Sequence, residues 1–233
     1  MIKAVFFDLY GTLALFHPPK EKIQAAACEE HGLNVSEYGL LQGYKMADDY
    51  MSSENSSQSI FTRSKKQQDE FFTQYEKLIL NGAGIDASAN LALKVWEWVK
   101  KTPNDLVLYD DCIPALEALK NQNLTIGLLS NLRRNLTKLI EQLGLIPYVD
   151  FAISSQEVGA EKPHAPIFLA ALARAKVSRK EAMHVGDQYN SDIKGALGVG
   201  MRALLLDRNN TDTNDHKKVL SLIEVSGHIK SIR

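Results

Sequence analysis

Short apolar runs and amphipathic stretches divide the sequence into two kinds of region. Residues 4–7 form a continuous apolar run that ends at Asp8, which is typical of a buried parallel strand. From about residue 18 to residue 102 helical patterning dominates, and no strand-like run interrupts it. Within this region a serine-rich polar stretch, 52–59, is expected to be a loop. The helices expected here are 20–31, 67–80 and 88–101.

After residue 102 the two patterns alternate, which indicates repeated strand–helix units. This order predicts an α/β fold with a doubly wound parallel sheet covered by helices on both faces. The core of that fold is expected to comprise residues 1–16 and 103–233, with an inserted helical domain at 17–102. No role is predicted for the polar segment after residue 209. The strands expected in the core are 125–129, 151–153, 182–185 and 202–206, and the helices are 113–121, 135–143, 166–175 and a segment near 192–197.

Four of the five predicted strands end at a residue that can take part in chemistry. These strand-end residues are Asp8, Ser130, Ser154 and Asp187. In open α/β sheets ligands bind outside the carboxyl ends of the strands, so these side chains are expected to converge on one crevice. The helical insertion leaves the core after Asp8 and is expected to cover that crevice.

Composition and charge narrow the classes of partner and compartment. The formal net charge of -1 provides no field that would attract nucleic acid or an anionic membrane, and neither is expected as a partner. No apolar run approaches the roughly 20 residues that span a bilayer, and the first run is too short for a signal peptide. Cys28 and Cys112 lie far apart and outside any Cys/His cluster, so both are expected to be reduced thiols, as in a cytoplasmic protein.

Three short motifs offer groups for anion chemistry, each with an ordinary structural alternative. Asp8 is followed by Gly11, which permits an unusual turn, although an aspartate before a turn is commonly a turn former. Ser130 and Asn131 offer a hydroxyl and an amide to anionic oxygens, or they cap the next helix. Lys162 lies in a loop, where it either neutralises a bound anion or is simply solvated.

The strongest single motif contains two aspartates on one strand-end loop. Asp187 and Asp192 would repel each other unless a cation or a network of donors offsets their charge. A hard divalent ion with oxygen ligands is the natural occupant, while Asp192 can also cap the following helix. His184, on the strand before Asp187, is expected to be a packed histidine rather than an acid or base.

Taken together and in order, these motifs resemble the four motifs of the haloacid dehalogenase-like hydrolase superfamily. The resemblance covers the whole chain, because the insertion at 17–102 is similar to the α-helical cap domain of that family and the rest to its Rossmann-like core. It implies a hydrolase with Asp8 as covalent nucleophile. It also implies a Mg2+ ion held by Asp8, the backbone carbonyl of Tyr10 and Asp187.

The same resemblance implies roles for the remaining motif residues. Ser130 would bind the transferred group, Lys162 would stabilise its charge, and Asn131 is counted with them among the catalytic residues. Thr12 and Asp192 would support the site, Asp192 by assisting the metal or by orienting Lys162. The implied substrate is a small molecule.

Tyr10 departs from the pattern of the family's phosphatases, which carry a second aspartate there as general acid. A phenol with a reference pKa of about 10 is a much weaker acid, and losing a general acid typically lowers the rate about 10²–10⁴-fold. The 2-haloacid dehalogenases also have tyrosine at this position, because a halide leaves without a proton. They replace the aspartate that corresponds to Asp187, however, and use an arginine early in the cap, whereas residues 18–47 contain none.

Three functions therefore remain open at this point. The first, which Asp187 and Asp192 favour, is a Mg2+-dependent phosphatase acting on small phosphorylated metabolites. The second is a 2-haloacid dehalogenase, which Tyr10 favours. The third is a non-catalytic protein that keeps the fold, since function resides in sites rather than folds.

Overall fold

The computed structural model describes residues 1–132, 135–213 and 216–232. Arg133 and Arg134 are expected to face solvent on a helix or to reach the mouth of the crevice, and they lie outside these ranges. The chain divides into two compact units. The core unit consists of Met1–Leu15 and Leu106–Arg233, and the inserted unit is Phe16–Asp105.

The core unit is built on a six-stranded sheet in which every neighbouring pair is parallel. The strand order is β5-β4-β1-β6-β7-β8, so β1 lies in the interior of the sheet between β4 and β6. All four residues of β1 are buried, as expected for a strand covered on both faces. The strands are β1 (Ala4–Phe7), β4 (Thr125–Ser130), β5 (Phe151–Ser154), β6 (Ala182–Gly186), β7 (Arg202–Leu206) and β8 (Lys218–Val219).

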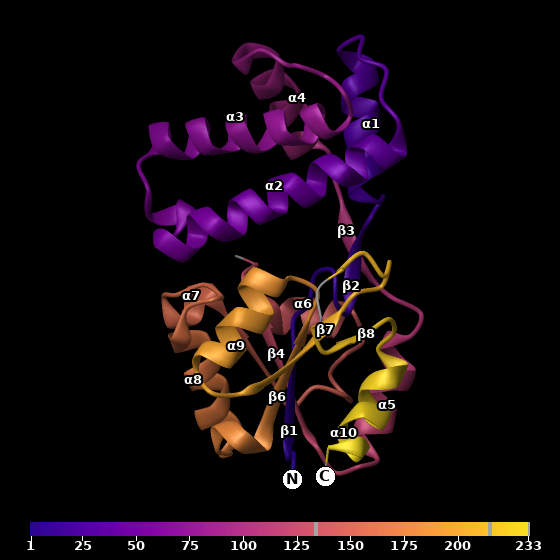
Figure 1. The fold of residues 1–233 in the computed structure, drawn as a ribbon, viewed down its shortest axis with the longest axis vertical. Coiled ribbons are helices and arrows are strands. Elements are labelled where there is room, and N and C mark those ends of the chain that lie inside the picture. Colours follow the sequence, from indigo (N-terminus) through magenta and orange to yellow (C-terminus); the bar gives the residue numbers. More distant parts are fainter. Residues whose placement is uncertain (133–134, 214–215, 233) are drawn as a thin grey trace. The chain divides into compact units, whose positions relative to one another are not determined.

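Helices cover both faces of this sheet. In Figure 1, α8 and α9 lie on one side of the strands, and α5 and α10 lie on the other. Helix α8 packs on β4 and β5, whereas α10 packs on α5, which contacts β4. The predicted doubly wound α/β fold is confirmed. The helices are α5 (Cys112–Lys120), α6 (Leu136–Gln142), α7 (Ser155–Val158), α8 (Ala165–Ala175), α9 (Lys194–Gly198) and α10 (Ile223–Ser231), with short turns η2 (Arg179–Glu181) and η3 (Tyr189–Ile193).

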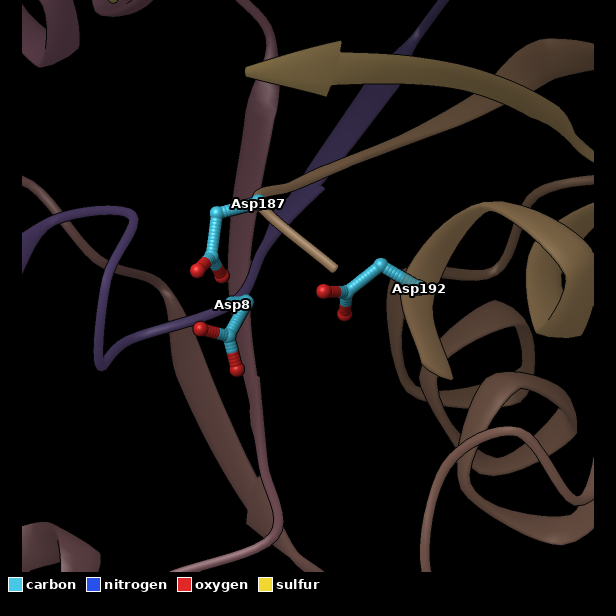
Figure 2. A group of neighbouring side chains, drawn as sticks. All are labelled: Asp8, Asp187 and Asp192. Atoms are coloured by element: carbon cyan, nitrogen blue, oxygen red, sulfur yellow. The ribbon is translucent and has the colours of Figure 1, made fainter. Parts of the chain in front are cut away.

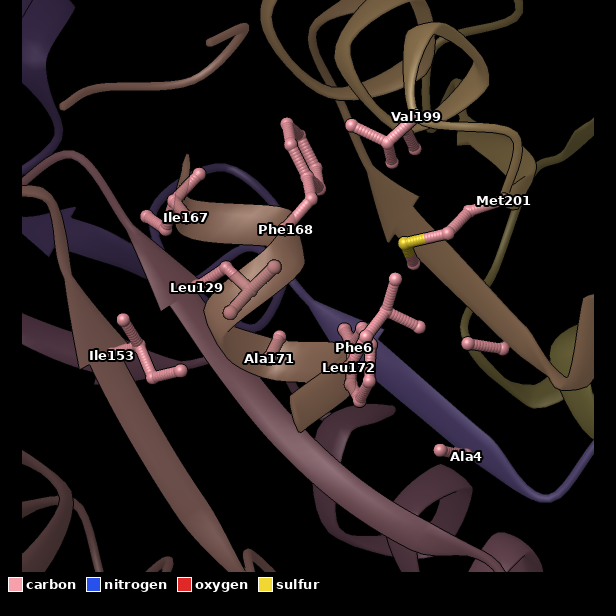
Figure 3. Packing of buried hydrophobic residues seen from close by; sticks show 12 residues of the cluster. Ala4, Phe6, Leu129, Ile153, Ile167, Phe168, Ala171, Leu172, Val199 and Met201 are labelled. Atoms are coloured by element: carbon pink, nitrogen blue, oxygen red, sulfur yellow. The ribbon is translucent and has the colours of Figure 1, made fainter. Parts of the chain in front are cut away.

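The apolar core between the sheet and α8 explains why these segments fold as they do. Figure 3 shows Phe6 of β1, Leu129 of β4 and Ile153 of β5 facing Phe168 of α8, with Met201 closing the cluster. All five side chains are almost completely buried. Burying a side chain of this size stabilises the folded state by roughly 1.5–3 kcal/mol, so this cluster holds the strands in place.

The inserted unit is helical, as the sequence predicts, but its serine-rich stretch is not a loop. Residues 52–57 belong to helix α2, which runs through the position where a solvated connection was expected. Ser52 and Asn55 are buried, and the Asn55 side chain accepts a hydrogen bond from the Ile60 amide at 3.0 Å. Tertiary packing therefore outweighs the weak helix preference of serine. The helices are α1 (Lys20–Glu30), α2 (Glu37–Ser57), η1 (Ile60–Thr62), α3 (Lys65–Gly82) and α4 (Ala89–Lys101).

A second, two-stranded sheet stands where the chain passes between the units. It pairs β2 (Ala14–His17) with β3 (Asp105–Leu108). The sequence did not predict these strands, nor the two-residue β8.

Two predictions about individual features of the chain can be compared with the structure. Cys28 and Cys112 are buried free thiols, as predicted. Among the residues that the structure describes, no helix is both long and apolar enough to span a bilayer.

Candidate active site

Three adjacent strands bring the candidate catalytic residues to one edge of the sheet. Asp8 directly follows β1, Ser130 ends β4 and Asp187 directly follows β6. The chain visits β4 and β5 on one side of β1 before it crosses to β6 on the other side. The order of strands therefore reverses beside β1, and such a point is where open α/β sheets bind ligands. The structure places Asp8, Ser130 and Asp187 at this edge, as predicted. The fourth predicted residue, Ser154, ends the next strand, β5, where its Oγ accepts from the Glu157 amide at 3.1 Å.

Three carboxylates gather at this edge (Figure 2). One oxygen from each of Asp8, Asp187 and Asp192 lies within 4.8 Å of the others. Asp8 and Asp192 are buried and Asp187 is partly buried. Carboxylates this close raise each other's energy, so the cluster requires a nearby positive charge.

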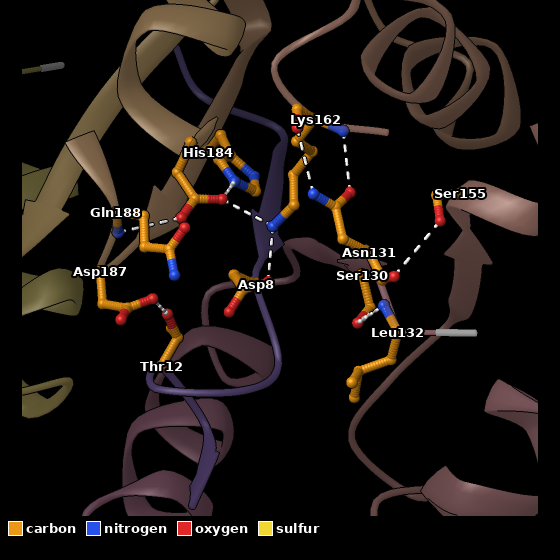
Figure 4. Close-up of polar contacts among 11 residues, drawn as sticks. Asp8, Thr12, Ser130, Asn131, Leu132, Ser155, Lys162, His184, Asp187 and Gln188 are labelled. Atoms are coloured by element: carbon orange, nitrogen blue, oxygen red, sulfur yellow. Dashed lines mark hydrogen bonds and ion pairs between the residues drawn. The ribbon is translucent and has the colours of Figure 1, made fainter. Parts of the chain in front are cut away.

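Lys162 supplies one such charge from within the protein (Figure 4). Its Nζ donates to Asp8 Oδ1 at 2.5 Å and to Asp192 Oδ1 at 2.6 Å, and the side chain is 2% exposed. Burial by itself lowers the pKa of Lys162, but the attraction of Asp192 and Asp8 outweighs it and raises that pKa above its usual value. The ammonium therefore stays charged. Its position in a loop did not by itself distinguish this lysine from a solvated one, whereas the family resemblance singled it out.

Asp192 is fully engaged by the protein around it. Besides Lys162, His184 Nε2 contacts Asp192 Oδ1 at 2.8 Å, and the Gln188 amide donates to Oδ2 at 3.1 Å. Burial would raise the pKa of Asp192, but the charge of Lys162 and the hydrogen bond from His184 hold it well below its usual range. The residue lies on the π-helical turn Tyr189–Ile193, a local widening that the sequence did not indicate.

His184 is packed, as predicted, but it also has a polar role that was not predicted. Its ring is fully buried and meets Phe168 edge to face, with ring centroids 5.3 Å apart. Burial lowers the pKa of His184, which favours the neutral ring. Because Asp192 is a carboxylate and can only accept, the hydrogen between them belongs to His184 Nε2.

Two opposing effects set the pKa of Asp8. Burial raises its pKa to about 6, and the neighbouring Lys162 opposes that rise. A carboxyl group with this pKa is ionised above about pH 6 and is poorly hydrated. An ionised, desolvated carboxylate beside a fixed ammonium has the properties of a nucleophile.

The loop after Asp8, residues 9–14, is hereafter the nucleophile loop, and it lies directly against Asp187. Gly11 has a φ of +87°, and a Cβ at this position would overlap the Asp187 carboxylate. Thr12 Oγ1 donates to Asp187 Oδ1 at 3.3 Å. Glycine at position 11 is therefore required both by the backbone conformation and by the close approach.

Asn131 contacts Lys162 through the backbone of that lysine. Its Nδ2 donates to the Lys162 carbonyl at 3.1 Å, and its Oδ1 accepts from the Lys162 amide at 2.8 Å (Figure 4). This pair of bonds fixes the loop that carries Lys162. The sequence had offered the Asn131 amide either to anionic oxygens or as a cap of the next helix, and it did not indicate this contact. Ser130 is buried beside it, and its Oγ accepts from the Leu132 amide at 3.1 Å.

Comparison with known proteins identifies the family. The family model of the haloacid dehalogenase-like hydrolases matches residues 2–200. The chain therefore belongs to this family of hydrolases, and the resemblance drawn from the four motifs is confirmed.

Three known proteins illustrate the range of relatives. The chain is 30% identical to a ribulose-1,5-bisphosphate 5-phosphatase from Halopiger xanaduensis, over 89% of this chain and 85% of that protein. It is 28% identical to a glyceraldehyde 3-phosphate phosphatase from Methanothermobacter thermautotrophicus, over 93% and 91% of the two chains. The crystal structure of a 2-haloacid dehalogenase from Pseudomonas syringae matches with a TM-score of 0.61 and 24% identity over all of both chains, a likeness that shows the fold alone.

The carboxylate cluster suits the divalent metal ion that hydrolases of this family generally use. All of its candidate donors are hard oxygens, and the Lys162 ammonium pairs with only two of the three carboxylates, Asp8 and Asp192. Two ligands of an octahedral ion with bonds of 2.0–2.1 Å are at most about 4.2 Å apart. Oxygens within 4.8 Å of one another reach that separation through small side-chain adjustments.

Proposed function

We propose that this chain is a Mg2+-dependent phosphatase that acts on small phosphorylated metabolites. The observation that carries the proposal is the buried Asp8–Lys162–Asp192 group beside Asp187, at the sheet edge where the strand order reverses. Its relatives named as phosphatases of ribulose-1,5-bisphosphate and glyceraldehyde 3-phosphate support the same substrate class. By the resemblance, the inserted unit is the cap that selects the substrate.

The residues suited to hold Mg2+ are Asp8, Asp187 and the backbone carbonyl of Tyr10. Asp192 already accepts from Lys162 and His184, which supports an orienting role for it rather than a ligand role. When bound, the ion neutralises negative charge on the phosphoryl oxygens.

The protein's own groups account for the bond changes. The carboxylate of Asp8 attacks phosphorus, and the bond from phosphorus to the leaving oxygen breaks as an aspartyl phosphate forms. The leaving oxide takes a proton from solvent. Water then attacks the phosphorus of this intermediate, gives up a proton to solvent, and releases phosphate and free Asp8. Lys162, held between Asp8 and Asp192, aligns the nucleophile and stabilises charge on the phosphoryl group. The Ser130 hydroxyl, at the end of the adjacent strand, is assigned to the same phosphoryl oxygens.

Because Tyr10 replaces the usual general acid, substrates whose leaving group needs a proton are expected to react slowly. The alkoxide released from an alkyl phosphate must be protonated as it leaves. The phenolate of an aryl phosphate and the carboxylate of an acyl phosphate leave more readily without a proton. Replacing Tyr10→Asp is therefore expected to raise kcat/KM on an alkyl phosphate, by up to about 10²–10⁴-fold, and to raise it less on an aryl phosphate. Tyr10→Asn is the matched control, since it has the same size as aspartate but cannot donate as an acid. Equal behaviour of the two folded variants would refute the missing-acid explanation.

The alternative function is a 2-haloacid dehalogenase, which Tyr10 favours and Asp187 opposes. We would assay an aryl phosphate and 2-chloropropionate side by side, each with Mg2+ and with EDTA. The proposal predicts phosphate release that requires Mg2+ and that falls on the order of 10⁴-fold in Asp8→Asn. Glu141→Gln, on an exposed position of α6, should retain full activity.

The other outcomes of this assay would overturn the proposal in distinct ways. Chloride release that is indifferent to EDTA would establish the dehalogenase. Absence of turnover on both substrates and on a panel of phosphorylated sugars, without any Mg2+-dependent change in Tm, would indicate a non-catalytic protein that keeps this fold.

A further inference from the structure

Arg208 follows β7 and reaches the nucleophile loop, although it belongs to none of the four motifs. Its Nη2 donates to the backbone carbonyl of Thr12 at 2.9 Å. Both residues belong to the core unit. A side chain from the C-terminal part of the sequence thus contacts the backbone of the loop that follows Asp8.

The guanidinium of Arg208 also contacts Asp111 and Tyr109. It pairs with Asp111 through two hydrogen bonds, Nη1 to Oδ2 and Nη2 to Oδ1, both 3.0 Å long. Its Cζ lies 3.8 Å from the centroid of the Tyr109 ring. A two-pronged pairing and a stacked ring together fix both the position and the plane of the group, which lysine could not reproduce.

Asp111 is itself anchored to the C-terminal segment. Ser221 Oγ donates to Asp111 Oδ2 at 2.8 Å, and the Leu222 amide donates to the same oxygen at 3.0 Å. Burial would raise the pKa of Asp111, but the hydrogen bonds from Arg208 and Ser221 lower it, so the group stays a carboxylate. The polar C-terminal segment, for which the sequence predicted no role, thus supports this arginine.

The nucleophile loop is held at two successive carbonyls. Arg208 binds that of Thr12, and the Tyr109 amide donates to that of Leu13 at 3.0 Å. On the other side of the same loop, the Thr12 hydroxyl contacts Asp187, and Gly11 lies against that carboxylate. A shift of the Thr12 carbonyl would therefore move the groups that touch Asp187.

We propose that Arg208 is a positioning residue, which holds the Thr12 carbonyl and thereby keeps the nucleophile loop in contact with Asp187. The structural part of this inference stands on the contacts themselves. Its catalytic part rests on the proposed function, in which Asp8 and Asp187 carry out the chemistry. The two parts need separate measurements.

The first measurement is amide hydrogen exchange, which needs neither substrate nor metal. The amides of Leu13 and Ala14 both donate to the Leu9 carbonyl within the loop. In Arg208→Met we expect their exchange protection to fall by about tenfold or more, while amides of β4 are unaffected, because only the local anchor is lost. Arg174→Met is the matched control, since Arg174 forms an exposed pair with Glu157 at 2.9 Å, and it should leave loop exchange unchanged.

The second measurement is a double-mutant cycle on phosphatase activity. Arg208→Met should lower kcat by roughly 10–100-fold and leave KM within about twofold, because the loss lies in alignment rather than in substrate binding. In a Thr12→Val background, where the hydroxyl contact to Asp187 is already absent, the same change should lower kcat by less than about threefold. If Arg208→Met fails to fold, Arg208→Lys keeps the charge without the fork and should give an intermediate loss in both measurements.

The outcomes separate the two proposals. Unchanged loop exchange in a folded Arg208 variant, or effects on kcat that simply multiply with those of Thr12→Val, would overturn the positioning role. A wild-type protein without phosphatase activity would overturn the proposed function instead, and the exchange result would still decide whether Arg208 holds the loop.

Discussion

Each of the two units contains a completely buried acidic side chain, and the two acids behave in opposite ways. In the core unit, Asp192 is bonded to Lys162 and His184, and its pKa lies well below the usual range. In the inserted unit, Glu76 of α3 accepts from Gln24 Nε2 at 2.5 Å, and burial raises the pKa of Glu76 to about 7. Within the described part of the chain, Glu76 Oε2 has no hydrogen-bond partner.

The two acids show separately how burial and how a charged partner affect the pKa of a carboxyl group. Both side chains are removed from water to the same degree, so desolvation alone cannot account for the difference. What differs is the partner, because a buried cation lies beside Asp192 and a neutral amide lies beside Glu76. In this protein the buried cation beside Asp192 keeps that acid ionised at neutral pH, whereas the neutral amide beside Glu76 does not offset the cost of burial. The charged network belongs to the candidate site, whereas the ionisation of Glu76 lowers the stability of its unit as pH rises.

The largest expected effect comes from removing the cation from the core unit. Lys162→Met leaves Asp8 and Asp192 buried without a positive partner, and we expect the free energy of unfolding to fall by about 3–5 kcal/mol, together with loss of hydrolysis. Urea denaturation at pH 7.5 measures the first effect. Lys120→Met is the control, because Lys120 pairs with Asp150 at 2.8 Å in a half-exposed position and should change stability by less than about 1 kcal/mol. Equal stability losses in the two variants would remove the distinction between buried and exposed pairs.

A smaller effect of opposite sign is expected in the inserted unit. The pKa of Glu76 is about 7 in the folded protein and 4.5 for the reference group, so the folded state binds more protons between these values. Stability should therefore fall as pH rises from about 4.5 to about 7. Glu76→Gln removes this loss, and we expect it to stabilise the protein at pH 8 by up to about 3 kcal/mol, with the gain vanishing below pH 4.5.

The measurement is thermal or urea unfolding of Glu76→Gln and wild type across that pH range. Glu70→Gln, at an exposed position of the same helix, controls for a general effect of removing negative charge. A gain in stability that does not depend on pH, or one that Glu70→Gln reproduces, would contradict this prediction. It would show that ionising Glu76 does not lower the stability of the folded protein.

The smallest effect sharpens the comparison by giving Glu76 the kind of partner that Asp192 has. Gln24→Lys places an ammonium beside Glu76 and should lower the pKa of that carboxyl, which would flatten the dependence of stability on pH between 4.5 and 7. Net stability at pH 8 should change by only about 1 kcal/mol, because the new pair must offset its own desolvation. Gln24→Met removes the donor without supplying charge and should steepen the same dependence. If both variants respond alike to pH, the identity of the partner is not what separates the two acids.

Local patterns in the sequence were sufficient for most of the fold and for the main elements of the site. The apolar run before Asp8 and the alternation after residue 102 predicted the sheet, and strand ends predicted which polar groups converge. The serine-rich part of α2 was missed because buried contacts of Ser52 and Asn55, not local preference, keep it helical.

The contacts that complete the site were harder to predict, because they join residues far apart in the chain. The hydrogen bonds of Asn131 to the Lys162 backbone and of Arg208 to the Thr12 carbonyl follow from the packing of separate segments. A single sequence carries no periodic signal for such pairs. The π-helical turn that directs Asp192 toward His184 likewise depends on a local hydrogen-bond pattern that composition does not specify.

The pairing of β2 with β3 bears on how proteins of this architecture diversify. Because these strands are hydrogen-bonded neighbours, the chain departs from the six-stranded sheet and returns to it through adjacent backbone segments. The entropic cost of closing a loop between two such anchors rises only slowly with the length of the loop. An insertion of different size or ancestry can therefore replace this one without redirecting the chain on either side.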